Sequence, residues 1–122
     1  MGALGILLVS GGHERAHYAF MMAAGAAALG RRVVVFATNE GCRALMPGAL
    51  GDDPREAVAE ARGVAGIGVL AEAAAELGVR RIACEAGLRM IGLVTAELAA
   101  GVEVAGIATF LEAVGSGQIV TL

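Results

Sequence analysis

The chain of 122 residues is long enough for one domain, residues 1–122, and its 57 % hydrophobic residues exclude a disordered chain. Its longest segment without Asp, Glu or Arg, residues 16–30, is shorter than the roughly 20 residues of a membrane-spanning helix. All nine basic residues are arginines and the net charge is −3, which excludes P-loop and Schiff-base lysines and argues against a nucleic-acid partner. We therefore expect no membrane association and, without a secretory signal, a cytoplasmic protein with reduced thiols.

The pattern of apolar runs, capping residues and glycines predicts strands that alternate with helices. The second predicted helix has the clearest start, because Asp53, Pro54 and Glu56 form an N-cap, a first-turn proline and a capping-box acid. In chain order, we expect a strand at 4–9, a helix at 15–29, a strand at 33–37, helices at 54–62 and 67–77, a strand at 81–84, a helical stretch at 86–100 broken at Gly92, a strand at 103–105, a helix at 109–114 and a strand at 118–122.

A repeated junction indicates the fold class. Residues 27–35 (AALGRRVVV) resemble residues 75–83 (AELGVRRIA), and residues 98–105 (LAAGVEVA) are a looser copy. Each copy predicts a helix that ends at a glycine with positive φ and leads into a buried strand. Such junctions build βαβ units, so the sequence predicts an α/β fold with a mainly parallel sheet covered by helices.

In a parallel α/β sheet, ligands bind beyond the carboxyl ends of the strands. Four segments come directly after predicted strands and should meet at that edge: residues 10–14 (SGGHE), 38–42 (TNEGC), 84–87 (CEAG) and 106–109 (GIAT). Both cysteines and one of the two histidines lie in these segments. The carboxyl edge is therefore the predicted functional site.

Cys84 is the first candidate for chemistry, because it ends a predicted strand and precedes a predicted helix. Backbone N–H groups at a helix start stabilise a thiolate. Arg89, one turn later, is a candidate for added positive charge, whereas Glu85 acts in the opposite direction. The alternative is that Cys84 is a small hydrophobic core residue.

The other candidate site residues are weaker. Cys42 is either a supporting thiol or part of a short helix after the second strand, and His13 is either a proton donor near the thiol or a helix-start residue. Gly11 and Gly12 come after a strand and open a helix, as in anion sites, but lack the spacing of a nucleotide-binding loop. Two Cys and two His match no zinc pattern, so we expect no metal and no other cofactor.

The segment Ile82-Ala83-Cys84-Glu85-Ala86-Gly87-Leu88-Arg89-Met90-Ile91-Gly92-Leu93 resembles the strand–Cys–helix segment of the DsrE/DsrF-like family of small sulfur-relay proteins. Residues 97–111 are similar to the next segment in members of that family, and residues 33–41 look like its second strand and turn. The resemblance thus covers most of the chain.

This resemblance implies a three-layer α/β/α domain with five parallel strands, assembled as a homotrimer or homohexamer. It also implies that Cys84 accepts sulfane sulfur as a persulfide and passes it on, with sulfur donor and acceptor proteins or small thiols as partners. One residue departs from the pattern: some relatives carry Ser or Thr at the position of Gly87.

Three functions remain open from the sequence. The first is a persulfide carrier or sulfurtransferase that uses Cys84. The second is a non-catalytic oligomeric module that binds a small anion or nucleotide at Gly11 and Gly12. The third is an oligomeric scaffold in which Cys84 only fills the core. Because one fold hosts many functions, the resemblance alone does not decide among them.

Overall fold

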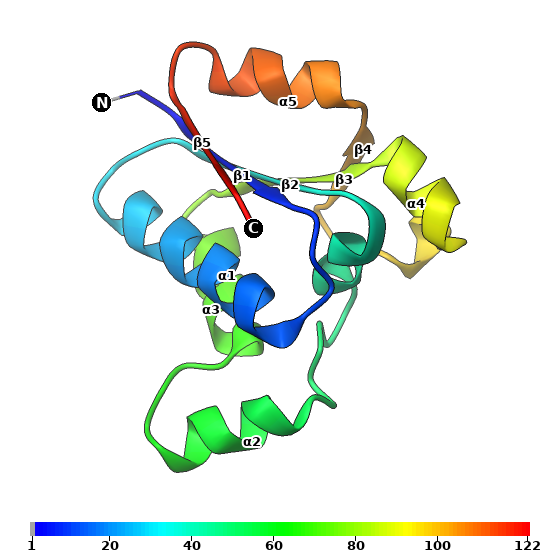
Figure 1. Cartoon of the computed structure of the whole chain (residues 1–122). Helices are drawn as coiled ribbons and strands as arrows, with labels where there is room; N and C mark the ends of the chain where they lie inside the picture. The colour runs from blue at the N-terminus through cyan, green and yellow to red at the C-terminus, as the bar shows by residue number, and fades with distance from the viewer. Residues whose placement is uncertain (1) are drawn as a thin grey trace.

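The computed structural model describes residues 2–122, with the backbone alone described at Ala96, and forms an α/β fold around one five-stranded sheet (Figure 1). The strand order is β4-β3-β2-β1-β5, and every neighbouring pair is parallel. The elements are β1 (Leu4–Leu8), α1 (His13–Ala28), β2 (Val33–Ala37), the 3-10 helix η1 (Asn39–Leu45), α2 (Pro54–Ala61), α3 (Ile67–Glu76), β3 (Arg80–Cys84), α4 (Glu85–Ile91), the 3-10 helix η2 (Thr95–Glu97), β4 (Glu103–Ala105), α5 (Ile107–Val114) and β5 (Gln118–Thr121).

The central strand β2 is buried along its whole length. Its sequence, VVVFA, consists mainly of residues that favour a pleated, buried strand, and all five are buried. It pairs with β1 on one side and β3 on the other. A strand buried on both faces requires a layer of helices on each side of the sheet.

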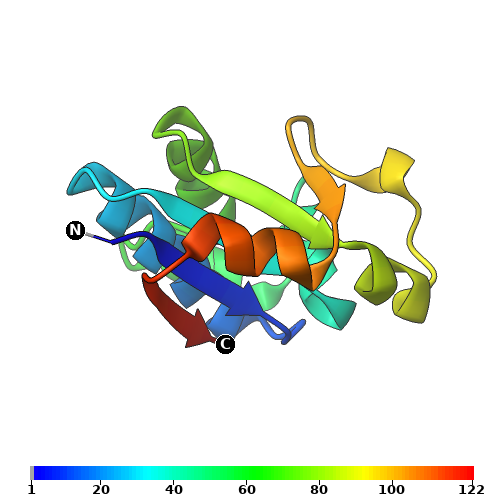
Figure 2. The same ribbon diagram turned by 90° about the horizontal axis from the view of Figure 1, so that it is seen from above.

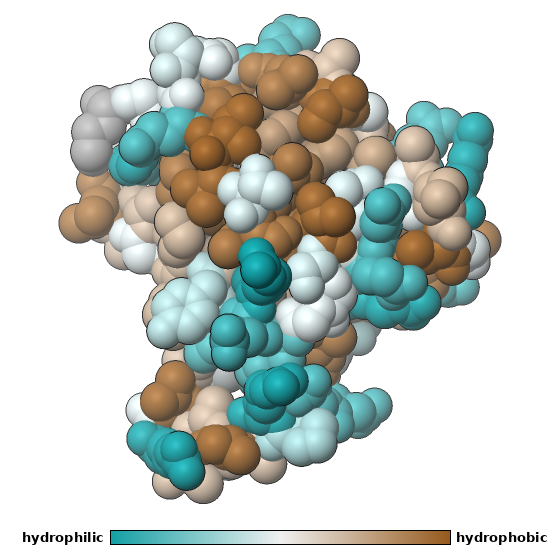
Figure 3. All heavy atoms as spheres, in the orientation of Figure 1, coloured by the Kyte–Doolittle hydropathy of each residue, from teal (hydrophilic) through white to brown (hydrophobic). Residues whose placement is uncertain are grey.

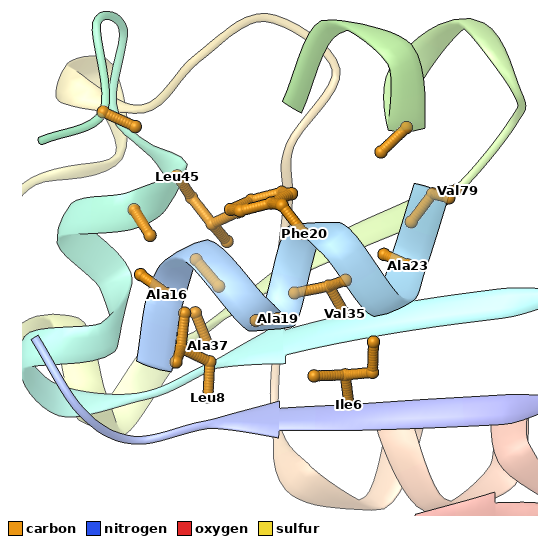
Figure 4. Packing of buried hydrophobic residues seen from close by; sticks show 14 of the residues in the cluster. Ile6, Leu8, Ala16, Ala19, Phe20, Ala23, Val35, Ala37, Leu45 and Val79 are labelled. Carbon is orange, nitrogen blue, oxygen red and sulfur yellow. The ribbon is translucent and has the colours of Figure 1, made fainter. Parts of the chain in front are cut away.

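The larger layer consists of α1 and α3. Ala16, Ala19, Phe20 and Ala23 of α1 belong to one buried cluster with side chains of β1 and β2, and Figure 4 shows the Phe20 ring extending toward Leu45 of η1. Alanines along this helix allow it to lie close to the sheet, and Phe20 is 1 % exposed in the same cluster. The two helices α1 and α3 also pack against each other.

The opposite layer is thin, because α5 is the one helix that covers this face in the described part of the chain (Figures 1 and 2). Phe110 of α5 stacks on Phe36 of β2, with 5.0 Å between the ring centroids. Val114 is buried beside it. Ile107 and Leu111 of the same helix stay about half exposed, and the apolar side chains around α5 and β5 gather on one face in Figure 3.

Helix α2 stands away from both layers (Figure 1). None of its residues is buried. Asp53 caps its start by accepting a hydrogen bond from the Arg55 amide at 2.9 Å, as the sequence predicts. Because the helix buries no side chain, its position depends on a few polar contacts with α1 and α3.

The structure confirms the parallel α/β fold and most predicted elements. The break predicted at Gly92 is confirmed: α4 ends at Ile91, because Gly92 adopts a left-handed conformation with φ of 72°. The helix predicted beyond this break, up to residue 100, is wrong, since the chain forms the short 3-10 helix η2 at Thr95–Glu97 instead. The third copy of the repeated junction is confirmed in part: Gly101 has a positive φ of 84° and leads into β4, but no α-helix ends there, since residues 100–101 form a turn. Helices α1 and α5 each begin two residues earlier than predicted. Among the described residues, no helix is long and apolar enough to cross a membrane.

The thin layer depends on Gly5 in β1. A Cβ at this position would collide with Val114 and lie 2.8 Å from Phe110 Cζ. We predict that Gly5→Ala lowers the free energy of unfolding by about 1–3 kcal/mol, measured by denaturant titration, because α5 must shift off the sheet.

The matched control is Gly25→Ala in α1, where no atom lies within 4 Å of the added Cβ. Here we expect stabilisation by about 0.5–1 kcal/mol, since alanine favours a helix interior. Equal effects of the two substitutions would contradict the packing argument.

Candidate functional site

The parallel sheet brings the four predicted segments to one edge, and close backbone packing joins three of them. A Cβ on Gly11 would lie 2.8 Å from Glu40 Cβ, and one on Gly87 would collide with Thr38 and the Asn39 amide. The segment after β2 therefore fits between the end of β1 and the start of α4. The edge is built from glycines that permit this approach.

Cys84 is the last residue of β3 and the N-cap of α4. Its Sγ accepts a hydrogen bond from the Gly87 amide at 3.4 Å. The side chain packs in the cluster under α5, with Phe36, Ile82 and Phe110, and the residue is 8 % exposed. The thiol thus sits at the carboxyl edge, near the surface but largely covered.

Arg89 does not add its charge to this thiol in the structure. Its guanidinium Nη2 donates to Glu85 Oε1 at 2.8 Å, and both side chains are more than half exposed. The two opposite charges that the sequence places near Cys84 therefore pair with each other on the solvent side of α4. Their net influence on the thiol is small, because exposed ion pairs are screened.

The absence of a hydroxyl at Gly87 has a steric cause. The space beside its Cα is occupied by the Thr38 side chain and by the backbone of Asn39. Asn39 has a positive φ of 50°, which asparagine tolerates. A serine at position 87 does not fit unless this turn moves, because its Cβ would collide with Thr38 Oγ1.

Cys42 lies within η1 and is fully buried on the other side of the sheet, in the cluster with α1 and α3. Its Sγ donates to the Ala37 carbonyl at 3.4 Å. Burial raises the pKa of the Cys42 thiol to about 11, and the nearby Cys84 thiol acts in the same direction, although the Cys84 backbone partly offsets this. Cys42 is therefore a neutral core thiol at pH 7.

His13 is buried at the start of α1, and its Nε2 donates to Glu56 Oε2 at 2.9 Å. It makes no hydrogen bond to either thiol among the described residues. Glu56 Oε1 also accepts the Ile67 amide at 2.9 Å, so one carboxylate joins α1, α2 and the N-terminus of α3. Gly66 provides the room, because a Cβ there would lie 2.8 Å from Glu56 Oε2.

The sequence did not single out Glu56 beyond its place in a capping box. The box predicts that Glu56 reaches back to its own helix start, but the carboxylate instead caps α3, eleven residues later. Residues 66–71 (GIGVLA) match the Gly-x-Gly-x-x-Ala spacing of a nucleotide-binding loop, but no predicted strand precedes them, and a helix start packed on its neighbour is the better interpretation. The structure confirms this interpretation, because Gly66 is the N-cap of α3 and α3 packs against α1. The sequence does contain one signal for this contact. Gly66 precedes α3 and has no side chain that could cap the helix, so a group from elsewhere in the chain must do so.

The structure gives little room for an anion at Gly11 and Gly12. The Gly12 amide donates to Ser10 Oγ at 3.0 Å, and Gly11 packs against Glu40, whose side chain is acidic. Within residues 2–122, no three His, Cys, Asp or Glu side chains gather in a way that would hold a metal ion.

The fold and the thiol position define a class: small three-layer α/β proteins with a cysteine at the end of an inner strand, here β3. The model of the DsrE/DsrF-like family matches residues 4–122. The chain therefore belongs to the DsrE/DsrF-like family. Comparison with curated proteins gives no match.

Two solved structures support the fold assignment. The ychN protein from E. coli has a TM-score of 0.77 at 16 % sequence identity, and protein MTH1491 of unknown function from Methanobacterium thermoautotrophicum has a TM-score of 0.63 at 18 % identity. Each alignment covers 100 % of both chains. At these identities the likeness concerns the fold alone.

The contacts of Glu56 predict a pH dependence of stability. Partial burial by itself raises the pKa of Glu56, but hydrogen bonds from His13 and from the Ile67 and Gly68 amides outweigh it, so the pKa lies below its ordinary value of 4.5. The carboxylate therefore stabilises the fold fully above the ordinary value, and this contribution is lost as the pH falls toward the lower, folded-state pKa.

We predict that Glu56→Gln lowers the free energy of unfolding at pH 7 by about 1–2 kcal/mol and flattens its decline below pH 4.5, measured by denaturant titration across pH. Glu60→Gln, an exposed change on the same helix, serves as the control and should keep the pH profile of the parent protein. Identical profiles for Glu56→Gln and the parent would contradict the assigned role.

Proposed function

We propose that the protein is a sulfur-relay protein that carries sulfane sulfur as a persulfide on Cys84. Family membership supports a sulfur-relay role. The observation that carries the assignment to Cys84 is its position as the N-cap of α4, where the Gly87 amide donates to Sγ. A backbone N–H that donates to Sγ stabilises negative charge on the sulfur, and the negatively charged thiolate is the form that reacts.

The transfer consists of two exchange steps. The Cys84 thiolate attacks the outer sulfur of a donor persulfide, R–S–SH, so a new S–S bond forms and the donor S–S bond breaks. The donor leaves as the thiolate R–S⁻, and Cys84 becomes the persulfide, with the proton on the transferred sulfur. An acceptor thiolate then attacks that outer sulfur and releases the Cys84 thiolate. Donor and acceptor are partner proteins or small thiols.

The contrast between the two cysteines supports Cys84 as the carrier. Cys42 is fully buried and has a raised pKa, so little thiolate exists at neutral pH. Cys84 retains 8 % exposure at the carboxyl edge. Both cysteines are free, and we propose that the protein works in a reducing compartment such as the cytoplasm, where Cys84 stays available.

We predict that a small alkyl persulfide adds one sulfur atom to the reduced, native protein, and that a reducing thiol removes it. Intact-mass spectrometry with peptide mapping should locate the added sulfur on Cys84. Cys84→Ser should abolish the adduct and keep the fold, because a serine hydroxyl also caps a helix start.

Cys42→Ser is the matched control, since it changes the same atom in the buried thiol and keeps a donor for the Ala37 carbonyl. It should leave sulfur loading unchanged. If Cys84 reacts with an alkylating reagent only after unfolding, the residue is core filler and the relay proposal fails.

We further propose that the protein assembles with itself, as a homotrimer or homohexamer, through the face formed by α5 and β5. Ile107, Leu111 and Ile119 on this face are 48 %, 51 % and 44 % exposed. The sequence of α5, IATFLEAV, is mostly apolar, and a helix of this composition usually has a buried position. Exposed apolar patches of this kind mark interfaces in symmetric assemblies.

We predict that Leu111→Glu converts the assembly to a smaller species in multi-angle light scattering, because a carboxylate is costly to bury in an interface. Leu29→Glu introduces the same charge at the end of α1, on the opposite side of the sheet, and should preserve the assembly. A monomeric parent protein at micromolar concentration would refute self-association.

A further inference from the structure

The two edge strands of the sheet differ in how well they are protected from pairing with another chain. β4 has three residues, and one of them, Glu103, forms an exposed ion pair with Arg80. β5 has the sequence QIVT, without a charged side chain or a proline. Proteins block edge strands by keeping them very short and by placing charges or prolines on them, and an edge without these features is a template for a further strand. β5 is therefore the open edge of this sheet.

Alternate residues of β5 point their backbone groups away from the sheet. The amides of Gln118 and Leu122 donate to the carbonyl oxygens of residues 3 and 7, at 3.0 and 2.8 Å, so residues 118, 120 and 122 face β1. The N–H and C=O groups of Ile119 and Thr121 consequently face outward. β5 is the last strand on this side of the sheet, and Figure 2 shows it at the rim, outside β1. These two donors and two acceptors therefore have no strand to pair with in the described part of the chain.

The side chains of β5 suit a paired strand as well as its backbone does. Ile119, Val120 and Thr121 are all β-branched, and such residues favour a pleated strand. Because α5 packs over β1 and β2, Ile119 stays 44 % exposed. Val120 is half-buried on the opposite face, against the larger core cluster. A further strand beside β5 would cover the open flank of these side chains.

We propose that β5 pairs with β5 of a second copy of this chain, antiparallel to it and about a two-fold axis. β5 carries no charge, so two identical strands bring no like charges opposite each other. The Arg31 guanidinium, which donates to Gln118 Oε1 at 2.9 Å, falls at opposite ends of the paired strands. This inference rests on the self-association proposed above and adds its symmetry. A two-fold axis requires an even number of copies, which selects the homohexamer over the homotrimer.

The outward backbone groups fix the register of this pairing. With Val120 on the axis, Ile119 of each strand lies opposite Thr121 of the other, and each such pair exchanges two hydrogen bonds. A register centred on Thr121 leaves Ile119 opposite a position past the end of β5. A register centred on Ile119 pairs Thr121 with Gly117, whose amide already donates to the Val114 carbonyl at 3.0 Å. The register centred on Val120 therefore satisfies all of the outward groups.

The test is a disulfide at the proposed axis. In an antiparallel pair that is not hydrogen-bonded, the two Cα atoms lie about 4.5 Å apart, within the range that a disulfide spans. In a chain with Cys42→Ser and Cys84→Ser, Val120→Cys should therefore give a disulfide-linked dimer on mild oxidation, measured by non-reducing electrophoresis and intact-mass spectrometry. Because this chain lacks both native thiols, the result does not depend on sulfur loading.

Gln118→Cys in the same chain is the matched control. Gln118 lies on the same face of β5 as Val120 and is the more exposed of the two, so random collisions would link this variant first. In the proposed register, residue 118 lies opposite residue 122 of the second copy and far from residue 118 of that copy. Gln118→Cys should therefore cross-link at least about tenfold more slowly than Val120→Cys. Equal or faster linking of Gln118→Cys would overturn the pairing.

Thr121→Pro gives an independent measurement. Proline at this outward position removes the N–H that donates to the second copy, whereas the hydrogen bonds between β1 and β5 remain. Multi-angle light scattering should show about half the molar mass of the parent, and Thr121→Val, which keeps the N–H, should keep the parent's mass.

An unchanged mass for Thr121→Pro, or a parent with an odd number of copies, would overturn the two-fold pairing. If Val120→Cys does not cross-link while Leu111→Glu still dissociates the parent, the edge pairing is wrong and self-association through α5 stands. If Val120→Cys cross-links and Leu111→Glu changes nothing, the edge pairing stands without the contact through α5.

Discussion

Burial of β2 on both of its faces is the constraint on which the rest of the structure depends. All five residues of Val33–Ala37 are buried, so helices must cover both sides of the sheet. The strands on either side of β2 are parallel to it, and parallel neighbours require crossover connections, which α1 and α3 provide. The same arrangement gathers the carboxyl ends of β1, β2 and β3 at one edge, which puts Cys84 beside the segment after β2.

Glycines determine how tightly that edge is packed. Gly41 passes so close to the Leu8 carbonyl that a Cβ would collide with it, and Gly87 does the same against Thr38. The segment after β2 therefore occupies the space between two neighbouring strand ends. This packing buries Cys42 completely and leaves Cys84 at the margin, so two chemically identical side chains have different environments.

Polar contacts, rather than apolar burial, connect α2 to the body of the protein. The Glu56 carboxylate bonds His13 and the Ile67 amide, and Gly66 leaves space for it. His17, which stacks on His13, donates to the Ala65 carbonyl at 2.7 Å. The histidine at the carboxyl edge thus has a structural role at the base of α2.

The sequence by itself determined the parallel α/β fold, most element positions and the place of Cys84 at a strand end. These features depend on short-range patterns, such as the glycines Gly30 and Gly78 with φ of 87° and 81°. The tertiary structure alone decided that His13 meets Glu56, 43 residues away, and that Gly87 packs against Thr38. Such partners are set by how crossover helices and strand ends meet in space, and no local pattern of side chains encodes that meeting.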